Sequence, residues 1–150
     1  MILLNTVVLS AAEKDVKKIL PQNISEFSLD EKQSKGEICD GLEIPIWDKV
    51  EKDDVLRFGP HIFFSDINND LVTERDNNSN CSYQTRTTFK KNVLDKNINQ
   101  VCKNKKMSAA TTVRAEILND KIIITYQQKT GKKEKNSTCI YKKDLKAKDE

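Results

Sequence analysis

The sequence predicts a mainly β protein, an antiparallel meander of about six strands that forms a small barrel or a curved sheet, with a short N-terminal helix. Polar and apolar side chains alternate over 81–89 and again over 109–128, which is the period of half-buried strands. Clusters of Asn, Asp, Ser and Gly separate the alternating stretches and indicate turns. Only 37% of the residues are hydrophobic and 33% are charged, which suits strands that bury a single face. A chain of 150 residues is expected to form one domain.

The N-terminal third carries the weakest strand signals. Residues 11–20 read as a short amphipathic helix that begins at a Ser-x-x-Glu capping box and ends at Pro21. The polar stretch 22–36 has no sustained period, so 13–36 is interpreted as a helix and linker arm. Residues 38–58 mix charges with Trp47, and we expect at most a short edge strand interrupted by Pro45.

The rest of the chain contains the meander, within a single β-rich domain at 37–143. Residues 90–106 are basic and rich in Asn, and are interpreted as a connection rather than a strand. The charged tail 144–150 is expected to fray. The predicted strands, in order, are 61–66, 71–75, 81–89, 109–118, 121–128 and 138–143.

The first residues and the cysteines bear on the compartment. Residues 1–12 resemble a signal peptide, with an apolar run followed by Ser10-Ala11-Ala12, but they lack a basic n-region, and the capping box is the competing interpretation. An even number of well-separated cysteines is typical of disulfides in exported proteins. We therefore expect a periplasmic or secreted protein, or a cytoplasmic one if residues 1–12 are not a signal peptide. No segment is long enough for a transmembrane helix.

The strand order predicts how the four cysteines pair. If 90–106 is a connection, Cys102 lies at the end of the sheet opposite Cys81, beside the start of the strand that contains Cys139. Cys81 is then left near the side from which Cys39 arrives. Of the three pairings of four cysteines, this order favours Cys39–Cys81 with Cys102–Cys139.

Charge is unevenly distributed along the chain. Residues 1–89 contain 10 basic and 16 acidic residues, a net charge of −6, whereas 90–150 contain 16 basic and 7 acidic, a net charge of +9. In one interpretation the two halves neutralise each other. In the other, lysines of the second half form a rim around a barrel mouth that binds an anionic ligand. The candidate binding residues are Lys103, Lys105, Lys106, Lys132, Lys133, Lys135, Tyr126 and Tyr141, with Lys129 in the same turn.

Several chemistries lack the residues they need. His61 is the single histidine and no Cys-x-x-Cys pair exists, which argues against a zinc site. Four glycines do not form a phosphate-binding loop. Residues 66–77 begin like a calcium loop but have Leu71 and Asn77 where Gly and Glu are required. Aromatic residues do not interleave with the lysines, so we expect no nucleic-acid partner. From the missing histidine, cysteine and glycine motifs we expect no cofactor and no metal ion.

These observations favour an exported, non-enzymatic β-domain of the bacterial envelope or secretome that binds a small or anionic ligand, with peripheral envelope contact left open. The alternative is a protein–protein inhibitor or interaction module acting through an exposed loop. A third hypothesis is a small hydrolase that uses His61. A ligand binder requires a cavity lined by residues such as Tyr83, Phe89, Tyr126 or Tyr141, whereas an inhibitor requires a filled core and a rigid protruding loop.

Overall fold

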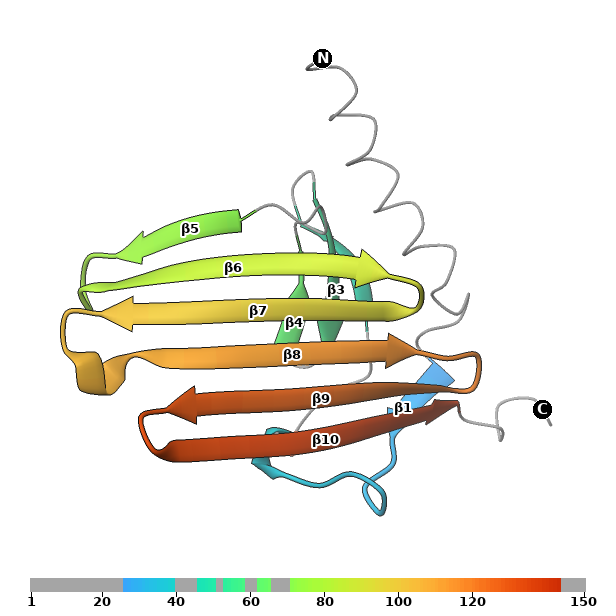
Figure 1. Cartoon of the computed structure of the whole chain (residues 1–150). Helices are drawn as coiled ribbons and strands as arrows, with labels where there is room; N and C mark the ends of the chain where they lie inside the picture. Colours follow the sequence, from blue (N-terminus) through green and yellow to red (C-terminus); the bar gives the residue numbers. More distant parts are fainter. Residues whose placement is uncertain (1–25, 40–45, 51–52, 59–61, 66–70, 144–150) are drawn as a thin grey trace.

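A computed structural model describes residues 26–39, 46–50, 53–58, 62–65 and 71–143 of the chain (Figure 1). The expected signal peptide at 1–12, the helix at 11–20 and the tail at 144–150 lie outside these residues, as does His61.

The described residues form two antiparallel sheets and two short 3-10 helices. The large sheet has the strand order β1-β10-β9-β8-β7-β6-β5, and the small sheet has the order β2-β3-β4. In the large sheet the strands are β1 (Phe27–Leu29), β5 (Leu71–Asp76), β6 (Cys81–Lys90), β7 (Val93–Cys102), β8 (Ala109–Ile117), β9 (Lys121–Thr130) and β10 (Lys133–Lys143). The small sheet contains β2 (Ile46–Val50), β3 (Asp53–Phe58) and β4 (Ile62–Phe64), and the 3-10 helices are η2 (Glu37–Cys39) and η3 (Lys105–Met107).

The predicted mainly β, antiparallel class is confirmed, and the predicted barrel is wrong. The large sheet is open, because β1 and β5 are its edge strands and do not pair with each other. The small sheet lies against one face of the large sheet rather than extending it (Figure 1). Of the two expected forms, the small barrel and the curved sheet, the barrel is therefore excluded for the described residues.

Strand β7 is the main element that the sequence did not predict. It occupies most of the segment interpreted as a basic connection, and it pairs with β6 on one side and β8 on the other. Lys96 and Gln100 occupy two of its inward positions. These polar residues interrupt the alternation of polar and apolar side chains that would indicate a strand. The other inward positions are Leu94, Ile98 and Cys102. Lys96 is nonetheless buried, with 7% of its surface exposed.

Because of the extra strand, β8, β9 and β10 each run in the direction opposite to the one predicted. The predicted disulfide pairing is wrong for that reason. Cys102 returns to the end of the sheet where Cys81 begins, and the two lie directly opposite each other and are bonded. Cys139 lies within β10 rather than at its start, and it is bonded to Cys39. All four cysteines are in disulfides, as expected.

Residues 26–39, which we call the arm, close one edge of the large sheet. Phe27–Leu29 pairs with the end of β10, and Lys35 makes a two-way backbone bridge with Thr138 at 2.7 and 2.8 Å. Between them, the Ser34 hydroxyl accepts a hydrogen bond from the Ile140 N–H at 2.9 Å. The arm thus satisfies backbone groups along an edge that would otherwise be open to another strand. The sequence interpretation of this segment as a linker missed both β1 and this contact.

The core lies between the two sheets. Phe58 of the small sheet packs on Tyr141 of β10 with ring centroids 5.5 Å apart, and on Phe64 at 6.3 Å. Burial on this face alternates along parts of β7, β8 and β10, as half-buried strands require. The buried residues of this core cluster are Phe27, Cys39, Leu56, Phe58, Ile62, Phe64, Leu94, Val113, Ala115, Ile117, Ile122, Ile124, Cys139 and Tyr141.

Candidate functional site

A cavity of about 430 Å³ lies where the arm crosses β9 and β10. The arm supplies one wall, and β9 and β10 supply the floor and the rest of the rim. Its size falls within the range usual for small-molecule sites, which is roughly 300–1,000 Å³. The lining residues are Gly36, Glu37, Ile38, Tyr126, Gln128, Glu134, Lys135, Asn136 and Ser137.

Strand register brings the floor residues together. Ser137 lies opposite Tyr126, and Lys135 lies opposite Gln128, so these four alternate positions share one face of the β9–β10 pair. Tyr126 is half-buried and packs against the core, whereas Ser137 is buried. The floor therefore offers an aromatic ring from Tyr126, a hydroxyl from Ser137, an amide from Gln128 and an ammonium group from Lys135.

The arm is held close to this floor. The Ile38 N–H donates to the Ser137 hydroxyl at 3.4 Å, and the Cys39–Cys139 disulfide follows one residue later. Gly36 has a φ of +112°, and a Cβ at this position would overlap the Ser137 side chain. A glycine is required here both for its backbone conformation and for the closeness of the two chains.

The rim of the cavity carries charges of both signs. Lys135 Nζ lies 4.0 Å from a Glu37 carboxylate oxygen, and both side chains are largely exposed. Glu134 accepts hydrogen bonds from Gln127 at 2.7 Å and Asn136 at 3.2 Å. These two bonds lower the pKa of Glu134, so its carboxylate is charged at neutral pH.

The structure separates the predicted binding residues into four places. Tyr126 and Lys135 line the cavity, and Lys132 and Lys133 are exposed at the adjoining β9–β10 turn. Tyr141 is fully buried in the core and does not line it. The lysines of the β7–β8 connection, Lys103, Lys105 and Lys106, lie at the same end of the large sheet as that turn (Figure 1), but they do not line the cavity.

No sequence pattern indicates the wall of the cavity that the arm supplies. Gly36 ends the segment without periodicity and Ile38 follows it, and only the pairing of the arm with β10 brings them beside Tyr126. Gln128 and Ser137 were missed because amide and hydroxyl side chains are common on any strand face. Because Tyr126 and Gln128 are two residues apart on one strand, the sequence does indicate that they share a face.

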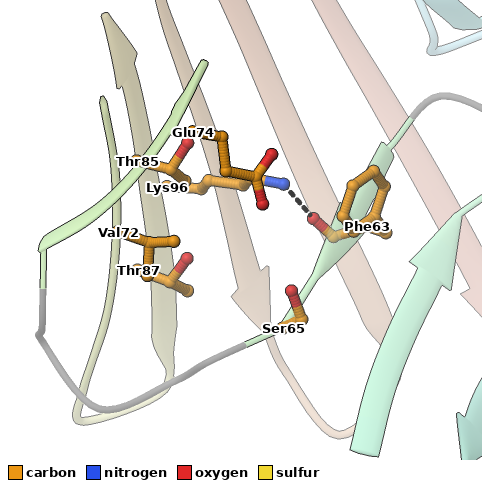
Figure 2. Close-up of a pocket in the computed structure, with 7 residues that line it drawn as sticks. All are labelled: Phe63, Ser65, Val72, Glu74, Thr85, Thr87 and Lys96. Atoms are coloured by element: carbon orange, nitrogen blue, oxygen red, sulfur yellow. Dashed lines mark hydrogen bonds between the residues drawn. The ribbon is translucent and has the colours of Figure 1, made fainter. Parts of the chain in front are cut away.

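A second, smaller space of about 90 Å³ lies between the two sheets (Figure 2). Lys96 points into it, donates to the Phe63 carbonyl oxygen at 2.8 Å, and has its Nζ 3.7 Å from the centre of the Phe63 ring. A space of this size is below that of ordinary ligand sites. We interpret it as the junction between the sheets. The remaining residues around it are Ser65, Val72, Glu74, Thr85 and Thr87.

Among the residues that the structure describes, no group of three or more His, Cys, Asp or Glu side chains could hold a metal ion. No described helix is long and apolar enough to cross a membrane. The two disulfides are consistent with an oxidising compartment. Comparisons with protein-family models, curated proteins and solved structures found no match to this chain.

Proposed function

We propose that this chain is an exported, non-enzymatic binding protein that holds a small ligand with an anionic group in the cavity between the arm and β9–β10. The observation that supports this function is the composition of the cavity. Ile38 and the Tyr126 ring offer apolar contact, Gln128 and Ser137 offer hydrogen bonds, and Lys135 offers a positive charge at the rim. A few convergent polar groups in a partly apolar hollow are typical of ligand sites.

Lys135 is the group best placed for the ligand's anion. Its contact with Glu37 is 4.0 Å long and joins two largely exposed side chains, so it contributes little to stability. An anionic group in the cavity would take the place of Glu37 at small cost. Glu37 and Glu134 then limit the cavity to ligands with few negative charges.

The disulfides support the proposed compartment, the bacterial periplasm or the extracellular medium. Cys39–Cys139 attaches the wall of the cavity to its floor, so an oxidising environment would also maintain the site. Blocking free thiols in intact host cells before lysis tests this. Four blocked cysteines in the recovered protein would contradict export, whereas four cysteines that react only after reduction would support it.

Native mass spectrometry of the full chain purified from its own host tests the binding function. We expect a small molecule that stays bound under native conditions and is released on denaturation. Tyr126→Ala should lose it, because the ring forms part of the floor. Tyr83→Ala is the matched control, since Tyr83 is a half-buried tyrosine on the same face but outside the cavity.

Two results would contradict the proposal. One is the loss of the bound molecule in the Tyr83 variant but not in the Tyr126 variant. The other is chemical conversion of the released molecule on incubation with fresh protein, which would show an enzyme rather than a binding protein.

A further inference from the structure

Residues 103–108, which we call the tethered loop, connect β7 to β8 at one end of the large sheet (Figure 1). The loop is joined to its surroundings at both ends. The Lys103 N–H donates to the Asn80 carbonyl at 3.1 Å, and the Ser108 hydroxyl accepts from the Cys102 N–H at 3.1 Å. The Cys81–Cys102 disulfide lies directly beside these contacts.

The tethered loop is also ordered internally. Asn104 caps the 3-10 turn η3, because its side chain accepts from the Lys106 N–H at 3.1 Å and its carbonyl accepts from the Met107 N–H at 3.0 Å. Gln100 reaches from β7 and donates to the Met107 carbonyl at 3.1 Å. Six exposed or half-exposed residues are thus held in one conformation before any partner binds.

Hydrogen bonds hold the backbone of the tethered loop, whereas its lysine and methionine side chains are exposed. Lys103, Lys105 and Lys106 are exposed, and within the described part of the chain none has a carboxylate within 4.0 Å. Met107 is 48% exposed, and Val101, the last residue but one of β7, is 56% exposed.

The two lysines at the end of β10 are paired with carboxylates instead. Lys142 pairs with Asp30 at 2.9 Å, and Lys143 approaches Glu26 at 3.7 Å. The basic second half of the chain is therefore partly neutralised by the acidic arm, but not at the tethered loop.

We propose that the tethered loop is a docking site for a partner protein whose acidic surface surrounds an apolar pocket that receives Met107. A loop already held in its bound conformation loses little conformational entropy on binding. A flexible, polarizable methionine adapts well to such a pocket. The lysines supply charge complementarity, which raises the association rate and selects the partner. The loop does not line the ligand cavity, so this proposal is independent of the proposed ligand.

The observations favour a protein over a lipid surface. Among the described residues, only Val101 and Met107 are large exposed hydrophobic side chains at this end of the sheet. Stable membrane binding requires a larger apolar area, such as the face of an amphipathic helix or a lipid chain. A single methionine among fixed lysines instead matches a pocket of defined shape.

Selection from a phage-displayed library of random peptides on the oxidised full chain tests the proposal. We expect enriched peptides to contain Asp or Glu on both sides of an apolar residue. Binding of a synthetic copy, followed by fluorescence anisotropy, should weaken about tenfold in Lys105→Glu/Lys106→Glu and several-fold in Met107→Ala. The matched control is Lys90→Glu/Lys91→Glu, two adjacent exposed lysines at the other end of the sheet, which should change little.

Each other outcome would overturn the docking site. Peptides that bind equally to the loop variants, or that are lost only in Tyr126→Ala, would place recognition elsewhere. Met107-dependent sedimentation with vesicles of phosphatidylcholine and phosphatidylglycerol, without peptide enrichment, would assign the loop to a membrane. Lys105→Gln/Lys106→Gln serves as a second variant, and thermal unfolding confirms that every variant is folded.

Discussion

Gly36 is the residue on which the junction between the arm and β10 depends. Its φ of +112° is disfavoured for other residues, and its Cα hydrogens face the Ser137 side chain directly. Both the backbone and the packing at this point therefore exclude a side chain.

Gly36→Ala should lower the free energy of unfolding by about 2–4 kcal/mol, through the strain of the positive φ together with the overlap with Ser137. Urea denaturation measures it. Gly131→Ala is the control, because Gly131 has a φ of +60° but nothing within 4 Å of an added Cβ, and should cost only about 1–2 kcal/mol. Equal losses in the two variants would show that the close contact with Ser137 is not made.

Asp30 fixes the turn of the arm between β1 and Lys35. Its carboxylate pairs with Lys142 at 2.9 Å and accepts from the Lys32 and Gln33 N–H groups at 3.1 and 3.2 Å. The Lys142 contact, followed by these backbone bonds, lowers the pKa of Asp30 below its ordinary value of 3.8.

This shift predicts how acid affects the arm. A carboxyl group whose folded pKa is lowered stabilises the fold above its unfolded pKa, and this stability is lost as the pH falls through the folded pKa. Asp30→Asn should therefore be less stable than the parent at neutral pH, and the difference should shrink below about pH 4. Urea midpoints across pH measure it. A difference that stays constant in acid would contradict the ion pair, and Lys142→Gln should show the same convergence.

At the scale of elements, the two disulfides have different structural roles. Cys81–Cys102 joins neighbouring strands of one hairpin and spans 21 residues of sequence, whereas Cys39–Cys139 joins the arm to β10 and spans 100. Chain entropy in the unfolded state makes the longer closure the more stabilising one.

Removing Cys39–Cys139 by a double alanine substitution should cost about 4.7 kcal/mol, against about 3 kcal/mol for Cys81–Cys102. Urea unfolding of the oxidised variants gives both values, with the fully reduced parent as the lower reference. A larger loss from the Cys81–Cys102 variant would reverse this ranking. Loss of ligand binding is expected only for the Cys39–Cys139 variant, because that bridge attaches the cavity wall.

The elements themselves show what sequence patterns can predict. Strands β6, β8 and β9 alternate cleanly and were predicted within a few residues. Strand β7 was missed because burial of Lys96 depends on a carbonyl from the other sheet, which no local pattern reveals. Of the candidate site, Tyr126 and Lys135 were predicted, whereas the wall formed by the arm was not, because it depends on pairing between residues about 100 positions apart.

At the scale of the whole molecule, Lys96 links the two sheets. It extends from β7 to the backbone of β4 and lies over the Phe63 ring (Figure 2). A buried hydrogen bond from a charged donor contributes more than one between neutral groups.

Lys96→Met should therefore destabilise the protein by about 1–3 kcal/mol, because it leaves the Phe63 carbonyl without this donor while keeping a side chain of similar length. Phe63→Leu removes only the ring contact and should cost about 0.5–1 kcal/mol. Thermal unfolding compares the two. If Lys96→Met were more stable than the parent, burial of the charged lysine would lower the free energy of unfolding more than its hydrogen bond raises it.

The sequence by itself determined the antiparallel β class, the turns around the alternating strands and the bonding of all four cysteines. These features follow from local periodicity and composition. Only the tertiary structure decided that the sheet is open, that β7 exists, which cysteines pair and where the arm lies. Each of these depends on contacts between segments that are distant in the sequence. The most important are the hydrogen bond from Lys96 to the Phe63 carbonyl and the pairing of the arm with the edge of β10.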